Sequence, residues 1–421
     1  MKNMNSENIS NLLEKQREHL SRREFIQKTS AGAIGASLAM CGWWDAVAQE
    51  FKEDESLPKE ESFTAKDMKY RILGRTELKV SEISFGAIQI HNTGLAPLNR
   101  AFELGVNYID TASGYGRGNS ERTLSEFLKE HRKDVIVATK WSGLLGYKKE
   151  EPHITTTKEE LIKSTEDSLS RMQTDVIDVI QIHGAKMAEQ VNAPVVQEAF
   201  DELKKAGKVR FLGVTTHTNQ HKVINAAVKS GAYDVVLVAY NFMSPKNHKE
   251  ALDNAKKANV GVVIMKAVKA LRPLAKSTTP KSVLFQGALK WILEHDSVSN
   301  IIPTMASVQE VEEDIVAVSK KMSYGQRRAL QFYAQAIDRD YCRMCGTCTE
   351  NCPRGVEVTD ILRYRTYYVA DGDTAGATSL YRSLTKDQTV ANCDKCGVCN
   401  DACPYHLDVV EKLYQAHAMM A

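Results

Sequence analysis

Two cysteine clusters near the C-terminal end of the chain are the residues with the most specific chemistry. Each follows the pattern C-x₂-C-x₂-C-x₃-C-P, in CRMCGTCTENCP at 342–353 and in CDKCGVCNDACP at 393–404. Three thiolates at this spacing wrap three corners of a cubane, and the fourth cysteine of each motif reaches the other cluster. We therefore expect two [4Fe–4S] clusters. The first takes Cys342, Cys345, Cys348 and Cys403, and the second takes Cys352, Cys393, Cys396 and Cys399.

Zinc and disulfide bonds are the competing uses of these cysteines. Structural zinc sites usually pair two C-x₂-C units around one ion, which leaves the remaining cysteines of each motif without a role. A disulfide framework does not require three cysteines within seven residues. Two copies of the full pattern therefore favour iron–sulfur clusters.

A second set of reactive side chains lies at the ends of short apolar runs. Asp110 ends VNYID, Tyr115 follows in TASGYG, Lys140 ends VIVATK, and His183 ends DVIQIH. Taken singly, each has an ordinary explanation as a surface charge or a satisfied core histidine. Their repeated position after consecutive runs indicates that one fold places them together.

The runs that precede these residues form a regular pattern of strands and helices. Amphipathic segments such as KEELIKSTEDSLSRM separate the runs, with apolar residues three and four apart. Such alternation predicts a parallel sheet, and eight units over residues 67–322 fit an α/β fold of the closed (β/α)₈ TIM-barrel type. The eight predicted strands are 83–85, 106–109, 135–138, 176–182, 209–214, 235–239, 260–265 and 301–302. Residues 323–421 are helical in pattern and predict a small α-helical, ferredoxin-like domain that carries the cysteines.

The stretch from Lys69 to Val318 resembles the aldo-keto reductase superfamily. The resemblance rests on YRILGRTELKVSEISFGA, GVNYIDTASGYGRGNSERTLSEFLKE, VIVATK and KVRFLGVTTH. The C-terminal sequence resembles the branch of this superfamily that has an added ferredoxin-like domain. The resemblance rests on CPRGVEVTDILRYR, LYRSL and the second cysteine motif. The resemblance implies an oxidoreductase that interconverts small carbonyl compounds, sugars among them, and alcohols.

The resemblance also implies roles for the four residues at the strand ends. Tyr115 would protonate the alkoxide, and Lys140, held by Asp110, would lower the pKa of the tyrosine from its usual value of about 10. His183 would donate a hydrogen bond to the substrate carbonyl and orient it. The hydride would come from a nicotinamide that lies across the barrel rim.

The nicotinamide contacts that the resemblance implies are less regular. They fall at Thr215, Asn241, Met265, Lys266, Thr304 and Met305. Leu237 replaces a common glutamine, and Met265 or Lys266 replaces the tyrosine that stacks on the ring. Thr304, Met305 and Glu310 stand at positions that are often Lys, Ser and Arg, so no cation meets a 2′-phosphate there. We therefore expect that NAD(P)(H), if used, binds as NAD(H) rather than NADP(H); another acceptor remains open.

The N-terminal residues 1–48 have the three parts of an export signal. The pair Arg22-Arg23 with Phe25 follows the twin-arginine pattern, an apolar run extends from Ala31 to Met40, and Ala46-Val47-Ala48 provides a cleavage site. This predicts a periplasmic protein, with residues 49–66 as a polar linker. A lipoprotein anchor at Cys41 is a minor alternative, which the bulky Met40 disfavours. The other alternative is a polar tail without a targeting function, in which the arginine pair occurs by chance. The twin-arginine route carries folded proteins with their cofactors, which agrees with clusters inserted before export.

The composition excludes other classes of protein. The net charge is +2, and there is no basic field for nucleic acid. No apolar run is long enough for a transmembrane segment.

Three functional interpretations follow from these observations. The leading one is an exported iron–sulfur oxidoreductase that acts on a small-molecule carbonyl or alcohol, with a redox partner protein that its clusters could serve. The first alternative is an electron-transfer or redox-sensing protein whose barrel does not turn over nicotinamide. The second is a binding subunit that uses the barrel as a scaffold, since fold alone does not determine function.

The export signal can be tested by replacing Arg22 and Arg23 with lysines. Because the twin-arginine route is recognised through this pair, we expect the variant to remain in the cytoplasm with its clusters. Fractionation of cells that express the two forms measures this. Unchanged recovery of the variant from the periplasm would contradict the twin-arginine assignment.

Overall fold

The computed structural model describes residues 64–145, 155–271, 281–319 and 321–421. The predicted signal segment and most of the predicted linker lie outside these residues. None of the helices in the described ranges is long and apolar enough to cross a membrane.

A parallel sheet of eight strands is the centre of the described fold, and its strands pair in sequence order. They are β3 (Phe85–Gly86), β4 (Tyr108–Asp110), β5 (Ile136–Trp141), β6 (Ile177–Ile182), β7 (Val209–Thr216), β8 (Val235–Ala239), β9 (Gly261–Met265) and β10 (Asn300–Ile302). Each predicted apolar run contains or overlaps one of them.

Backbone pairing between the first and last strands closes this sheet. Parallel bridges join Ile83 to Ile301 and Gly86 to Thr304. A side chain at Gly86 would lie 2.7 Å from the carbonyl oxygen of Pro303, so the two strands can approach this closely only at a glycine. The predicted (β/α)₈ barrel is therefore confirmed.

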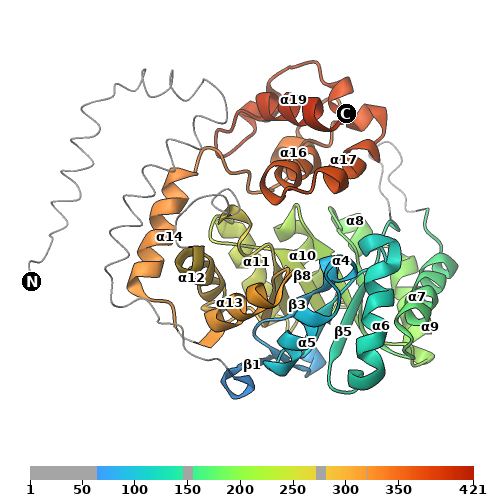
Figure 1. Ribbon diagram of the computed structural model, residues 1–421. Coiled ribbons are helices and arrows are strands. Elements are labelled where there is room, and N and C mark those ends of the chain that lie inside the picture. The colour runs from blue at the N-terminus through green and yellow to red at the C-terminus, as the bar shows by residue number, and fades with distance from the viewer. Residues whose placement is uncertain (1–63, 146–154, 272–280, 320) are drawn as a thin grey trace, which may run out of the picture. The chain divides into compact units, whose positions relative to one another are not determined.

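Helices surround the barrel strands, as Figure 1 shows. They are α4 (Ile90–Thr93), α5 (Ala96–Glu103), α6 (Asn119–His131), α7 (Lys158–Met172), α8 (Ala188–Val191), α9 (Pro194–Lys205), α10 (Gln220–Ser230), α11 (Lys246–Lys257), α12 (Lys281–Leu293) and α13 (Val308–Ser319). The sequence explains where they begin: Thr157 and Glu160 form a capping box at α7, and Pro194 occupies the first turn of α9. Helix α7 then buries Leu161, Leu169 and Met172 against the barrel.

Two apolar layers stabilise the barrel. The inner layer fills the barrel and includes Tyr108, Val179, Leu237 and Val263. An antiparallel hairpin, β1 (Tyr70–Ile72) and β2 (Lys79–Ser81), contributes Leu73 from its turn to this layer. The outer layer lies between strands and helices, where apolar side chains of both meet. Because both faces of each strand are buried, the strands read as continuous apolar runs.

The C-terminal residues form a helical region with its own core. Its elements are α14 (Tyr324–Ala336), α15 (Thr347–Glu350), α16 (Val358–Thr366), the π-helical turn η6 (Tyr367–Asp371), α17 (Thr374–Arg382), α18 (Val398–Asp401) and α19 (Val409–Met420). Residues such as Val358, Ile361 and Leu413 pack around the buried cysteines Cys348, Cys399 and Cys403. We call residues 338–421 the cysteine domain. The predicted boundary at residue 323 falls at the N-cap of α14, which contacts the barrel through the Tyr333 hydroxyl and the Ala270 carbonyl oxygen, 2.9 Å apart.

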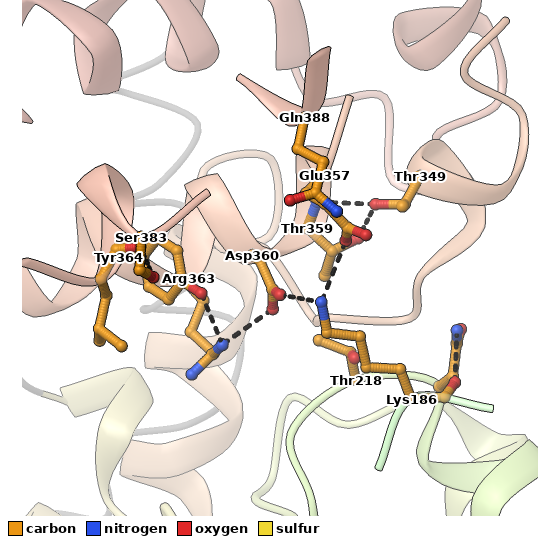
Figure 2. Close-up of polar contacts among 12 residues, drawn as sticks. Lys186, Thr218, Thr349, Glu357, Thr359, Asp360, Arg363, Tyr364, Ser383 and Gln388 are labelled. Carbon is orange, nitrogen blue, oxygen red and sulfur yellow. Dashed lines mark hydrogen bonds and ion pairs between the residues drawn. The ribbon is translucent and has the colours of Figure 1, made fainter. Parts of the chain in front are cut away.

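Charged side chains join the cysteine domain to the barrel, and both belong to one compact unit of the chain. Lys186, in the loop after β6, pairs with Asp360 of α16 and lies 3.2 Å from Glu357. Asp360 also pairs with Arg363 at 2.9 Å. Figure 2 shows the carboxylate of Asp360 between the two cations. The Asp360 side chain is only 4% exposed, and despite burial Arg363 and Lys186 hold its pKa down at about 2.

This buried carboxylate can be tested by Asp360→Asn. The folded pKa lies below the unfolded value of about 3.9, so the carboxylate stabilises the fold above about pH 4, and this contribution is lost as the pH falls through about 2. At pH 7 the variant leaves two cations facing an amide. We expect the free energy of unfolding to fall by roughly 2–4 kcal/mol, since breaking a buried pair is costly. Thermal unfolding measures this, with the exposed Asp387→Asn as control; equal midpoints for the two variants would contradict the assignment.

Candidate active site and cluster cavities

The four predicted catalytic residues are brought together at the carboxyl ends of β4, β5 and β6. Asp110 is the last residue of β4, Lys140 is the penultimate residue of β5, and His183 directly follows β6. Tyr115 begins the short 3₁₀ helix η4 (Tyr115–Gly118) after β4. Because these strands are parallel neighbours, their carboxyl ends meet on one rim, where barrel enzymes build their sites.

Lys140 is the centre of this group. Its ammonium contacts the Asp110 carboxylate, the Thr111 carbonyl oxygen at 2.6 Å and the Tyr115 hydroxyl at 3.4 Å. Its side chain is 2% exposed. Burial by itself would lower the pKa of Lys140, but Asp110 and Tyr115 raise it above its ordinary value. The lysine therefore stays charged beside the phenol.

A glutamine that was not singled out from the sequence also contacts Asp110, the partner of Lys140. The Gln181 amide donates a hydrogen bond of 3.0 Å to the second oxygen of Asp110. Gly213, on the neighbouring strand, leaves the space that Gln181 fills, because a side chain there would lie 2.9 Å from it. The signal in the sequence was a lone amide within the apolar run DVIQIH. Asp110 is thus held from two sides.

The pKa of Tyr115 differs from the sequence expectation. Burial raises it above the ordinary value, and the lowering effect of Lys140 is the smaller one; Asp110 raises it further. The structure therefore gives a net rise in place of the expected fall, because burial disfavours the charged phenolate more than the Lys140 ammonium favours it. At neutral pH the phenol keeps its proton and can act as a donor.

His183 lies beside Tyr115, with the two rings 5.8 Å apart and edge to face. Its Nδ1 is 2.6 Å from the hydroxyl of Ser142, which directly follows β5 and was not singled out from the sequence. Burial, with Lys140 and Arg363, lowers the pKa of His183 to about 3. The imidazole is therefore neutral, and with Ser142 donating to Nδ1 its Nε2–H can donate to a substrate oxygen.

Three of the predicted nicotinamide contacts line the rim but already have partners. The Thr215 hydroxyl accepts from the Gly184 backbone N–H at 2.8 Å. The Asn241 amide donates to the Tyr341 hydroxyl at 3.1 Å, and the Lys266 ammonium lies 4.7 Å from the ring centre of Tyr367. Tyr341 and Tyr367 both come from the C-terminal residues.

The other three predicted contacts lie elsewhere. Met265 ends β9 and packs against the inner apolar layer, and Thr304 forms the bridge to Gly86 that closes the barrel. Met305 is 1% exposed and belongs to the outer apolar layer. Nearby, the Glu310 carboxylate accepts from the Ala306 backbone N–H at 2.7 Å. The structure therefore does not gather the six residues into one set.

Residues of the cysteine domain reach the rim, and sequence reasoning assigned them no role. Arg363 of α16 donates to the Tyr367 hydroxyl at 3.3 Å, and Arg343 donates to the Met243 carbonyl oxygen at 3.1 Å. The void between them and the barrel loops after β7, β8 and β9 has a volume of about 20 Å³. That is room for one water molecule. For Arg363 and Tyr367, the signal in the sequence was the density of arginine and tyrosine in RYRTYY.

A larger cavity lies at the opposite end of the strands. Its volume is about 600 Å³, and Asn107, Ile136, Asp178 and Arg210 are among the residues that line it. Asp178 pairs there with Arg132 at 2.9 Å and with Arg210 at 2.6 Å. In barrels this end contributes stability rather than chemistry, so the cavity is not the candidate site.

The cysteines surround two cavities in the sets that the motif spacing predicted. One is lined by Cys342, Cys345, Cys348 and Cys403, and the other by Cys352, Cys393, Cys396 and Cys399. These eight described cysteines are free thiols. Each cavity is lined by four cysteine thiols, the set of ligands that a cubane takes. No group of three or more His, Cys, Asp or Glu in the described ranges has side chains placed so that they could hold a single metal ion.

Both motifs turn in the same way. Met344 and Gly346 in the first motif, and Lys395 and Gly397 in the second, have positive φ angles between 56° and 85°. These left-handed residues curve the chain around each cavity. The hydroxyl of Thr359 lies 3.5 Å from the Cys348 sulfur and adds a polar contact at the first cavity.

Comparison with known proteins agrees with both parts of the fold. Residues 82–272 match the aldo/keto reductase family, and residues 341–408 match a 4Fe-4S dicluster domain. An uncharacterized oxidoreductase of Bacillus subtilis, YqkF, is 24% identical over 299 residues, which are 64% of this chain and 97% of that protein. The L-galactose dehydrogenase of Arabidopsis thaliana is 29% identical over 306 residues, covering 63% of this chain and 93% of the relative.

A solved structure shows the same fold. The holo form of an aldo-keto reductase from Bacillus halodurans is 28% identical, with a TM-score of 0.53, and covers 64% of this chain and 97% of that one. The expected clusters and the expected reductase barrel are thus both supported. The chain is an oxidoreductase that carries an aldo/keto reductase domain followed by a C-terminal 4Fe-4S dicluster domain.

Proposed function

We propose that the protein interconverts a small carbonyl compound and its alcohol at the rim formed by Tyr115, Lys140, Asp110 and His183. One observation carries this proposal: the buried Lys140 ammonium contacts both the Asp110 carboxylate and the Tyr115 hydroxyl, with a neutral imidazole beside them. Ionisable groups that are perturbed by burial and by a specific charge partner cluster at functional sites.

Each residue has a distinct task in this chemistry. The substrate oxygen accepts hydrogen bonds from the Tyr115 hydroxyl and from Nε2–H of His183, which orient it. When a hydride donor adds hydride to the carbonyl carbon, Tyr115 passes its proton to the alkoxide that forms, and Lys140 stabilises the phenolate that remains. Asp110, held by Gln181, keeps the ammonium charged and in position.

Nicotinamide supplies hydride in this family, but the described rim does not fit it. The void beside Asn241 and Lys266 is about 20 Å³, and both side chains contact tyrosines of the C-terminal residues. A nicotinamide ring would have to displace these side chains to enter that space. The preference for NAD(H) over NADP(H) stays a prediction, supported by the Glu310 carboxylate next to the loop where a 2′-phosphate would need a cation.

The same observation favours a second function, electron transfer or redox sensing without nicotinamide turnover. Arg343 lines both the rim void and the cavity of Cys342, so the first cluster would lie next to the barrel. Hydride chemistry moves two electrons together, whereas each cluster moves one. A redox partner protein would then exchange electrons with the cysteine domain.

The proposed substrate class and cellular location each rest on a single observation. The Arabidopsis relative is named for L-galactose, which supports a sugar or related polyol as substrate. The twin-arginine pattern at residues 22–23 supports action outside the cytoplasm. Both proposals concern the same enzyme.

The clusters can be tested by iron analysis of the holoprotein. Two complete sets of four cysteines predict about eight irons per chain. Cys348→Ser and Cys399→Ser should each remove one cluster and leave about four irons, because each residue lines a different cavity. Zinc in place of iron, or loss of both clusters in either variant, would contradict the proposed ligand sets.

The catalytic assignment can be tested by Tyr115→Phe, which removes the proposed proton donor and keeps the ring. Positioned acid–base groups contribute about 10²–10⁴-fold, so turnover should fall by that factor with little change in substrate binding. Lys140→Met should move the pH optimum of alcohol oxidation upward, because the phenol loses the cation that lowers its pKa. Steady-state rates with carbonyls and sugar alcohols, using dye or nicotinamide acceptors, measure both effects.

The control for this series is Tyr324→Phe, whose side chain is largely exposed. It should turn over like the wild type. Near wild-type turnover of Tyr115→Phe would mean that the tetrad has no catalytic role, and it would favour the electron-transfer function.

A further inference from the structure

The rim void between the barrel and the cysteine domain collects positive charge. Lys266 and Lys269, after β9, line it from the barrel, and Arg343 and Arg363 line it from the cysteine domain. No aspartate or glutamate is among the described residues that line it. The remaining polar lining consists of amides, hydroxyls and an imidazole: His217, Gln220, Asn241, Ser244 and Tyr341. Such a surface suits an anion.

Lys269 is a buried cation at this void. The residue is 7% exposed, and no carboxylate in the described part of the chain forms an ion pair with it. Its ammonium lies 4.5 Å from the ring centre of Tyr367. Burial, together with Lys266 and Arg363, lowers the pKa of Lys269 to about 8, although Tyr367 and Asp371 oppose this. A buried cation without a counter-ion is costly.

Tyr367 compensates this charge only in part. Its hydroxyl accepts from Arg363, and its ring lies against both lysines. Burial would raise the pKa of Tyr367, but Lys266, Arg363 and Lys269 lower it to about 7. One partly ionised phenol therefore faces three cations. The carboxylate of Asp360 is shared by Arg363 and Lys186, as Figure 2 shows for that group, and Asp371 acts on Lys269 electrostatically.

The cationic void adjoins the proposed catalytic residues. Lys266 acts on the pKa of Tyr115, and Arg363 acts on that of His183, so both cations lie within electrostatic reach of the tetrad. A void of about 20 Å³ admits one small group in place of a water molecule and not a whole molecule. A ligand with one anionic group there would have its other end directed to the catalytic rim.

We propose that Lys266, Lys269 and Arg363 bind the carboxylate of the substrate, so that the enzyme acts on hydroxy- or oxo-acids such as sugar acids. The cysteine domain thereby supplies a specificity residue, Arg363, to the barrel. This inference rests on the proposed carbonyl–alcohol function. The diphosphate of a dinucleotide offers the same anionic chemistry, and the test separates the two.

The test compares the binding of D-galacturonate and D-galactose to the holoprotein by calorimetry, without turnover. The two sugars differ in a carboxylate against a hydroxymethyl group. We expect galacturonate to bind at least tenfold more tightly, since charge-assisted hydrogen bonds to a carboxylate are strong. Lys269→Met and Arg363→Gln should each remove about tenfold of this preference and leave galactose binding unchanged. Lys246→Met, whose side chain is 90% exposed, should keep the preference.

Other outcomes would overturn the proposal. Equal binding of the two sugars by the wild type, or an unchanged preference in Lys269→Met, would exclude a carboxylate site; Lys269→Met serves if Arg363→Gln fails to fold. Mutually exclusive binding of NADH and galacturonate would assign the void to the cofactor diphosphate. Tyr367→Phe should retain or tighten galacturonate binding. If Tyr367→Phe instead weakens galacturonate binding as much as Lys269→Met does, the cations serve only to position Tyr367.

Failure of this site and failure of the catalytic proposal are distinguishable. Tyr115→Phe should keep the preference for galacturonate while losing turnover. If the tetrad has no catalytic role, the preference for galacturonate over galactose should still be observed.

Discussion

The carboxylate of Asp360 is the contact on which the relation between the two parts of this protein depends. It is buried between Lys186, three residues after the proposed catalytic His183, and Arg363, which reaches the rim. Removing this carboxylate would leave the two cations facing each other without it, which is costly inside a protein. The barrel loop after β6 and helix α16 are thereby held together, and Arg363 is held beside the tetrad.

The charges at the rim set the protonation of the proposed catalytic groups. Lys140 stays charged because Asp110 is held against it by Gln181, while His183 stays neutral because it is buried near Lys140 and Arg363. Tyr115 keeps its proton because burial outweighs the lysine. The result is a donor phenol and a donor imidazole beside a fixed ammonium, which suits protonation of an alkoxide. The cysteine domain takes part in this balance through Arg363.

The position of the first cysteine cavity connects the two chemistries of the protein. Arg343 lines both this cavity and the rim void, and its guanidinium also stacks 3.8 Å from the ring centre of Tyr405. The second cavity includes Cys396, which is exposed. The two cavities therefore differ in surroundings: one adjoins the barrel, and one opens toward solvent. Two clusters in these places could pass single electrons between the surface and the rim.

Sequence patterns predicted the barrel, and they also predicted which residues form the proposed tetrad and the proposed cysteine sets, because each prediction depends on local patterns. Apolar runs specify strands, parallel strands align their carboxyl ends, and the spacing of three cysteines limits which cavity each can reach. The roles of Ser142, Gln181, Arg363 and Tyr367 were decided only by the tertiary structure. Their partners lie on other strands or in another domain, and no local pattern records such distant pairing. The pKa of Tyr115 was misjudged for the same reason: the sequence placed a lysine nearby, but burial is a property of the whole fold.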